Sequence, residues 1–192
     1  MGTAKVNGEM IRPASMSKAL AVVLCTLSGG AAAQDAALDG LFDALSTAEG
    51  PDAQQIAGKI AAEWSKSGSP AADLLLTRGR DALDAGDTAA AIGHLTALTE
   101  NAPDFAEGYN ARATAYFNDG QYGPALADIR QVLALNPRHF GAMIGMALIL
   151  DDIGSPSASL AIWREVERIY PASPEAARAI PDLSGRVEGQ DL

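Results

Sequence analysis

Apolar residues recur along most of the chain at the spacing of one helix face, in segments that short turns separate. Residues 118–137 show the pattern: Gly120 lies in a turn, an amphipathic run follows, and Pro137 ends it. The sequence has no convincing strand-like alternation, and its many alanines and few aromatics favour closely packed helices. The pattern therefore predicts an all-α fold built from antiparallel helix pairs.

The helix pairs repeat with a period of 34 residues. Residues 72–105, 106–139 and 140–173 align without a gap when their closing prolines are superimposed. Six columns keep one kind of residue: small at positions 8 (Gly79, Ala113, Ala147) and 20 (Ala91, Ala125, Ser159), glycine at 15 (Gly86, Gly120, Gly154), large and apolar at 24 (Leu95, Ile129, Trp163) and 27 (Leu98, Val132, Val166), and proline at 32 (Pro103, Pro137, Pro171). Small side chains let two helices approach closely, glycine permits a tight turn, and proline ends the second helix.

These columns resemble those of the tetratricopeptide repeat family. The middle unit, residues 106–139, carries the family pattern at Tyr109, Ala113, Tyr116, Gly120, Tyr122, Ala125, Val132 and Pro137. The other two units depart from it at aromatic columns, which hold Leu75 and Ala82 in the first and Met143, Leu150 and Pro156 in the third. The resemblance implies a tetratricopeptide repeat solenoid, an α-α superhelix, with three units in residues 72–173.

The segments on either side of the repeats are also expected to be helical. Residues 34–71 show two apolar faces, made of Leu38, Leu41, Phe42 and Leu45, and of Ile56, Ile60, Ala61 and Trp64. They predict a divergent helix pair that caps the array. Residues 174–192 predict a short capping helix that begins near Glu175, is interrupted at Pro181 and continues as a frayed tail.

Residues 1–33 are predicted to be an N-terminal extension followed by a cleaved signal peptide. The segment carries, in order, a positive charge, a short apolar stretch, a glycine interruption and small residues for a signal peptidase: Lys18, residues 19–27, Gly29-Gly30 and Ala31-Ala32-Ala33. Cleavage after Ala33 would leave Gln34 at the start of the mature chain. This predicts an exported bacterial protein, periplasmic or secreted, with no stable membrane anchor.

Two other interpretations of this segment stay open. An uncleaved anchor needs about 20 apolar residues to cross the bilayer, and the stretch 19–27 is shorter. A lipoprotein would use Cys25, but Leu24 precedes it where a small residue is expected. Residues 1–15 have none of the features of a signal peptide, which makes Met16 an alternative start.

The charge of the chain narrows the range of partners. The formal charge is −10, and loss of Lys5, Arg12, Lys18 and Glu9 with the signal would change it to −12. A phosphate backbone requires a basic surface, so nucleic-acid binding is not expected. Loss of Cys25, the single cysteine, would leave a thiol-free chain suited to an oxidising compartment.

The sequence shows no motif for catalysis, cofactor binding or metal binding. His94 and His139 have no cysteine or carboxylate at ligand spacing, so each is expected to lie at the surface or to be partly buried. The acidic groups lie near helix ends, where solvation explains them: Asp81, Asp84 and Asp87, and Asp151 and Asp152. The arginines are expected to be solvated or ion-paired: Arg78, Arg80, Arg112, Arg130 and Arg138.

The resemblance places positions 2, 5, 9, 12 and 13 of each unit on a concave groove. They are Asp73, Leu76, Arg80, Leu83 and Asp84, then Glu107, Asn110, Thr114, Phe117 and Asn118, then Gly141, Ile144, Leu148, Asp151 and Asp152. The candidates for partner binding are Leu76, Arg80, Leu83, Asn110, Thr114, Phe117, Ile144, Leu148 and Asp151. An apolar centre with polar edges fits an extended peptide or a helix. Core packing is the alternative for Leu76, Phe117, Ile144 and Leu148.

These expectations together predict a non-enzymatic adaptor of the bacterial cell envelope that binds a protein or peptide and needs no cofactor. A self-associating structural subunit and a regulator of an envelope enzyme are the alternatives. Some family members clamp a chaperone's C-terminal carboxylate with lysines, asparagines and an arginine in the groove. Only Asn110 stands where such a residue is expected here, and acids occupy several of the other places, so this mode is disfavoured.

Overall fold

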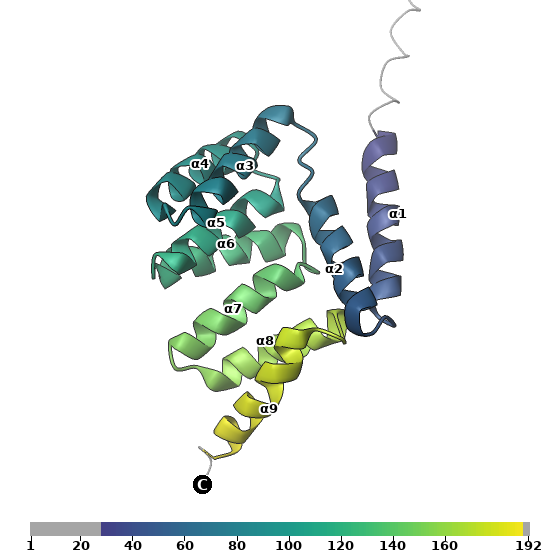
Figure 1. Cartoon of the computed structure of the whole chain (residues 1–192), viewed down its shortest axis with the longest axis vertical. Helices are drawn as coiled ribbons and strands as arrows, with labels where there is room; N and C mark the ends of the chain where they lie inside the picture. Colours follow the sequence, from purple (N-terminus) through teal and green to yellow (C-terminus); the bar gives the residue numbers. More distant parts are fainter. Residues whose placement is uncertain (1–27, 190–192) are drawn as a thin grey trace, which may run out of the picture.

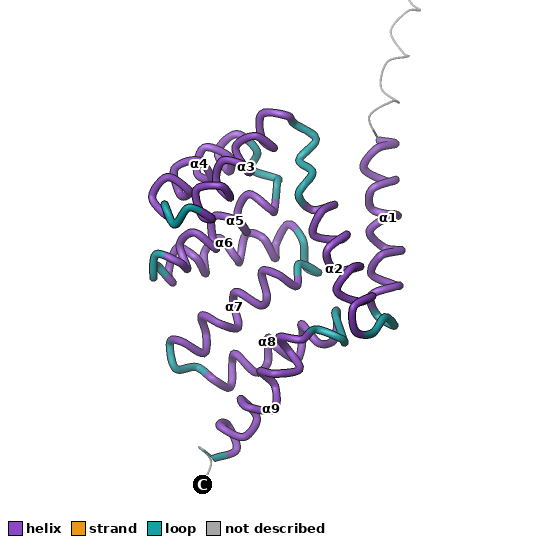
Figure 2. Tube along the Cα trace, viewed as in Figure 1, coloured by secondary structure: helices purple, strands orange, loops and turns teal. Residues whose placement is uncertain are grey.

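The structure, a computed structural model, describes residues 28–189, and in that range it contains nine α-helices and no strand. The helices are α1 (Ser28–Leu45), α2 (Gly50–Trp64), α3 (Pro70–Asp84), α4 (Thr88–Asn101), α5 (Ala106–Asn118), α6 (Tyr122–Leu135), α7 (Phe140–Asp152), α8 (Pro156–Ile169) and α9 (Pro174–Glu188). The pairs α3–α4, α5–α6 and α7–α8 stack into a curved array, with α1 and α2 along one side and α9 after the last pair (Figures 1 and 2). The prediction of an all-α solenoid is confirmed.

The three units share one turn between their helices, as the glycine column predicts. Gly86, Gly120 and Gly154 have φ angles of 75°, 69° and 78°. These left-handed angles suit glycine because it has no Cβ. The residue after each glycine donates its N–H to a carbonyl oxygen five positions earlier at 2.8 Å, from Asp87 to Ala82 and likewise in the next two units. This Schellman arrangement satisfies carbonyls that the helix end would otherwise leave without donors.

The small residues of the repeats lie where two helices come close together. Ala91, Ala125 and Ser159 have no exposed surface, and Ser159 donates its hydroxyl to the Ala147 carbonyl at 2.7 Å. A Cβ on Gly79 would lie 2.5 Å from the side chain of Leu95. The first pair can therefore pack this closely only because position 8 carries glycine.

A largely buried ion pair within the second unit also contacts the first unit. Arg112 of α5 forms a two-pronged pair with Asp128 of α6, at 2.7 and 2.8 Å. Its third nitrogen donates to Thr99 of α4 at 2.7 Å. The guanidinium also lies over the rings of Tyr109 and Tyr116. The expectation that Arg112 is ion-paired is correct, and the contacts fix the angle between three successive helices.

The N-terminal helix pair is present, but it does not extend the stack ahead of the first repeat. Phe42, Leu45 and Ile60 share a core with the third repeat and α9. Arg138, in the turn before α7, lies 4.1 Å over the Phe42 ring and pairs with Asp39 at 2.6 Å. The predicted cap is therefore placed against the turns between repeats, because its aromatic partners lie there.

Two helix boundaries differ from the sequence prediction. Helix α1 runs through Gly29 and Gly30, and the predicted cleavage site after Ala33 lies within it; residues 1–27 of the predicted signal segment lie outside the described residues. Helix α9 continues through Pro181 to Glu188, so the predicted interruption and frayed tail are wrong over that range. Ala176 and Leu183 on α9 are buried against α8, and this packing outweighs the hydrogen bond lost at proline.

Candidate peptide-binding groove

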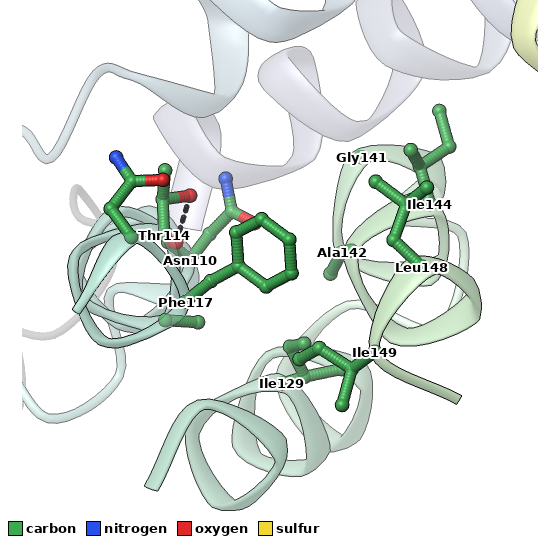
Figure 3. A pocket seen from close by; sticks show the side chains of 12 residues that line it. Asn110, Thr114, Phe117, Ile129, Gly141, Ala142, Ile144, Leu148 and Ile149 are labelled. Atoms are coloured by element: carbon green, nitrogen blue, oxygen red, sulfur yellow. Dashed lines mark hydrogen bonds between the residues drawn. The ribbon is translucent and has the colours of Figure 1, made fainter. Parts of the chain in front are cut away.

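A pocket of about 280 Å³ lies between α5 and α7, above a floor from α6 (Figure 3). It is surrounded by Asn110, Ala113, Thr114, Phe117, Asn118, Ile129, Gly141, Ala142, Ile144, Gly145, Leu148 and Ile149. Most of these side chains are apolar or small. The pocket can therefore take a large apolar side chain, and the small residues of α7 leave the space for it.

The two walls of the pocket carry its largest side chains. Phe117 on α5 stacks on Tyr122 with ring centres 5.7 Å apart, and Tyr122 donates its hydroxyl to Asp152 of α7 at 2.8 Å. Ile144 and Leu148 form the opposite wall, one turn apart on α7. Leu148 is 44% exposed, which is unusual for a leucine on a helix with so many apolar residues. The Phe117 ring is therefore held in place beside an apolar surface that water reaches.

Polar groups lie along the α5 side of the pocket. The Thr114 hydroxyl donates to the Asn110 carbonyl at 3.1 Å, as Figure 3 shows. The Asn110 amide donates to both carboxylate oxygens of Glu107, at 3.3 and 3.2 Å. Asn110 is thereby held by Glu107 while its amide oxygen stays available to accept a hydrogen bond.

We call the N-terminal ends of α5 and α7 the closed edge of the groove, because α2 covers them. Trp64 at the end of α2 stacks on His139 with ring centres 4.1 Å apart and also contacts Phe140. His139 is only 2% exposed and caps α7, since its Nδ1 accepts from the Ala142 N–H at 3.1 Å. The Nε2 atom of His139 therefore carries the proton and donates to Glu107 at 3.1 Å.

Glu107 is the centre of the polar contacts at the closed edge. Besides the bonds from His139 and Asn110, it accepts a short hydrogen bond from Arg80, which also donates to Ser65 at 3.1 Å. Burial alone would raise the pKa of Glu107, but the hydrogen bond from His139 and the charge of Arg80 outweigh it and hold that pKa below its ordinary value. The carboxylate therefore stays charged and is paired with Arg80.

We call the C-terminal ends of the same helices the open edge. Asn118 and Asp119 end α5, and Asp152 ends α7. Both aspartates are exposed, as is Asp84 at the end of α3. Asp119 accepts from Gln121 at 2.5 Å and from Thr88 at 3.3 Å, contacts with neutral groups that leave its charge uncompensated. The open edge therefore combines carboxylates with the negative ends of helix dipoles.

The structure gathers five of the nine predicted binding residues around one pocket. They are Asn110, Thr114, Phe117, Ile144 and Leu148. Leu76 is 3% exposed and packs with Ala111 and Ala115 of α5, so its core alternative is correct. That these five residues bind a partner stays a prediction.

The remaining three predicted residues lie outside the pocket. Leu83 packs against the core of the first unit. Arg80 is bound to Glu107 at the closed edge, and Asp151 pairs with Arg186 of α9 at 2.7 Å. These charged side chains hold helices together, which lowers their availability to a partner.

Other residues at the groove were not predicted from the sequence. Ile129 of α6 forms the floor, because the gap between α5 and α7 exposes part of the second helix. His139 was expected at the surface or partly buried, and this is wrong because Trp64 covers its ring. The sequence signal for His139 was its place two residues after Pro137, directly before a helix, where a capping side chain is favoured.

The described residues carry neither a metal-binding cluster nor a membrane-spanning helix. Within residues 28–189, no group of three or more His, Cys, Asp and Glu side chains is arranged to hold a metal ion. None of the helices in the same range is long and apolar enough to cross a bilayer.

Known proteins share both the sequence pattern and the fold. The tetratricopeptide repeat model matches residues 76–127 and 110–174. A repeat-containing protein of this type from Rhizobium etli is 38% identical over 153 residues, which cover 79% of this chain and 75% of that protein.

Solved tetratricopeptide repeat domains have a similar fold. The first such domain of Spaghetti (RPAP3), bound to the HSP90 peptide SRMEEVD, gives a TM-score of 0.60 at 21% identity over 62% of this chain and 95% of that one. The TPR2B domain of yeast Sti1, in complex with pHsp70, gives 0.57 at 20% identity over 62% and 99%. These solved domains share the fold of the three helix pairs, and the family model together with the Rhizobium etli relative shows that the chain belongs to the tetratricopeptide repeat family.

Proposed function

We propose that the chain is a non-enzymatic adaptor that holds a peptide or a helix of a partner protein in the groove between α5 and α7. The observation that carries this proposal is the open apolar pocket, in whose wall the Leu148 side chain is 44% exposed. Solved domains of similar fold support it, since the RPAP3 domain is bound to an HSP90 peptide and the Sti1 domain is in complex with pHsp70.

The size of the pocket suits one anchoring side chain. A leucine or phenylalanine that moves from water into an apolar pocket gains about 1.5–3 kcal/mol. Asn110 and Asn118 lie at the rim and can bond the backbone of the bound segment. An apolar anchor with flanking backbone contacts is the usual way in which grooves recognise peptides and helices.

A selection experiment tests this site. A random peptide library displayed on phage is selected on the full protein, and each recovered peptide is measured against two variants. Leu148→Glu places a charge at the pocket, and Leu74→Glu makes the same change at a residue that is 49% exposed on α3. We expect peptides that bind the wild type and Leu74→Glu equally and lose about tenfold or more in affinity with Leu148→Glu. A set of peptides indifferent to Leu148→Glu would contradict the proposal.

We further propose that the adaptor works in the cell envelope after cleavage of its signal peptide. The sequence of residues 16–37 supports this, with its positive start, apolar stretch and alanines. Cleavage after Ala33 would also leave in place the α1 side chains that the structure puts in or against the core, namely Leu38, Leu41, Phe42 and Leu45.

A reporter fusion tests the export proposal. Residues 16–37 are joined to an alkaline phosphatase that is active only after export. We expect activity and a product that begins at Gln34, and we expect Val23→Arg, which interrupts the apolar stretch, to abolish both. An inactive wild-type fusion, or a product that keeps residues before Gln34, would contradict the proposed export and cleavage.

A further inference from the structure

We infer that the groove between α5 and α7 selects a segment in which a lysine or arginine lies beside the apolar anchor. The inference rests on the proposed peptide-binding function and adds the charge of the partner. It follows from the different electrostatics of the two edges of one pocket.

Among the residues that the structure describes, the arginines at the closed edge are already paired with the protein's own carboxylates, Arg80 with Glu107 and Arg138 with Asp39. The N-terminal ends of α5 and α7 would attract an anion, but the protein places its own carboxylate, Glu107, there. Arg80, His139 and Asn110 all bond to that carboxylate. Trp64 covers the site from the α2 side. A partner carboxylate would therefore have to displace Glu107.

The open edge, by contrast, offers negative charge next to the pocket. Asp119 follows the pocket residue Asn118 directly, and Asp152 lies one turn after Leu148. Asp152 is joined to the pocket wall through the Tyr122 hydroxyl, at 2.8 Å, and the Tyr122 ring stacks on Phe117. A side chain in the pocket therefore has a neighbour in sequence that reaches one of these carboxylates.

The other charged groups near the open edge do not make its charge positive. Arg186 on α9 lies 2.7 Å from Asp151 and 3.6 Å from Asp182, so two carboxylates offset its charge. Asp84, at the end of α3, adds another exposed carboxylate. The C-terminal ends of α3, α5 and α7 add partial negative charge to the same edge. Exposed carboxylates and helix C-termini therefore make the open edge acidic.

Synthetic peptides test the preference directly. Three peptides of about nine residues, blocked at both ends, share a central Leu-Phe pair and are flanked by lysines, serines or glutamates. We expect the lysine peptide to bind the full protein about tenfold more tightly than the glutamate peptide at low salt. The difference should shrink in about 0.5 M NaCl, because salt screens exposed charges.

Isosteric variants test whether the preference for the lysine peptide comes from the carboxylates of the open edge. The double variant Asp119→Asn, Asp152→Asn removes two charges and keeps the acceptor for Tyr122. The control Glu100→Gln, Glu167→Gln removes two charges from exposed positions on second helices. We expect the first to reduce the lysine preference to about threefold or less, and the second to leave it near tenfold.

The outcomes separate this inference from the proposed function. If the glutamate peptide binds as well as the lysine peptide, and both depend on Leu148, the pocket is a peptide site and the charge inference is wrong. If the control reduces the preference as much as the open-edge variant, the effect is the net charge of the protein and the inference is also wrong. If none of the three peptides binds while phage selection yields Leu148-dependent peptides, the assigned partner chemistry is wrong and the groove function stands.

Discussion

The closed and open edges of the groove are built from the same helices, yet their side chains have different roles. At the closed edge, Glu107 and His139 are 7% and 2% exposed, and their polar atoms are bonded to one another and to α3. At the open edge, Asp152 and Leu148 face solvent. The comparison shows two roles for side chains in one repeat array: buried polar side chains fix the arrangement of the units, and exposed side chains remain for a partner.

Replacement of Trp64 should have the largest effect on stability. Trp64→Ala removes the ring that stacks on His139 and packs on Phe42 and Phe140, and we expect a loss of about 3 kcal/mol in the free energy of unfolding. Urea unfolding measures the loss, and hydrogen exchange should show faster opening of α1 and α2. Gln54→Ala, at an exposed site on α2, is the control and should stay within about 0.5 kcal/mol of the wild type. Equal stability of the two variants would mean that α2 is not held by its tryptophan.

Neutralisation of Glu107 should have an intermediate effect that depends on pH. Glu107→Gln keeps the shape and weakens the bonds from Arg80 and His139, and we expect a loss of about 1–2 kcal/mol near pH 7. Because the folded pKa of Glu107 lies below its ordinary value of 4.5, the stabilisation is full above that value and is lost as the pH falls through the folded pKa.

Urea unfolding of the wild type and Glu107→Gln between pH 7 and about pH 3.5 measures this effect. The gap between the two proteins should narrow as the pH falls, because protonation brings the wild type toward the state of the variant. A gap that is constant or wider in acid would contradict the role of the Glu107 charge.

Replacement of Leu148 should have the smallest effect on stability. Leu148→Ala shortens a side chain that is already 44% exposed, so we expect a change within about 0.5 kcal/mol. Ile149→Ala, at the next residue, should cost about 2–5 kcal/mol, since Ile149 has no exposed surface. Leu148→Ala should weaken peptide binding although it leaves the free energy of unfolding nearly unchanged. A large loss of stability in Leu148→Ala would place this residue in the core and remove the main support for the groove.

The array itself could be predicted from the sequence because its signals are local and repeat in phase. Gly86, Gly120 and Gly154 mark the turns, and the structure gives all three left-handed φ angles. The groove could be predicted only in part. Leu76 and Ile144 occupy the same repeat position, yet Leu76 is buried because Ala111 and Ala115 let α3 approach α5, whereas Ile144 borders a pocket. Burial at that position depends on the neighbouring unit.

The N-terminal helix pair shows the limit of such reasoning. Its helices are visible in the apolar periodicity, but its place is decided by single contacts between distant residues, such as Trp64 with His139 and Asp39 with Arg138. Contacts of this kind do not recur along the sequence, so the repeat pattern cannot predict them. The same applies to Pro181, whose local preference against a helix interior is overridden by the packing of Leu183.

The position of α2 has a mechanical consequence. A solenoid bends easily because each repeat contacts only its neighbours. Here the end of α2 touches the first repeat through Ser65 and Arg80 and the third through Trp64 and Phe140. It thus acts as a strut between units that are not adjacent, and it sets the spacing of α5 and α7 before any partner arrives. A groove whose width is already fixed loses less conformational entropy on binding, so a short segment with one anchor can suffice.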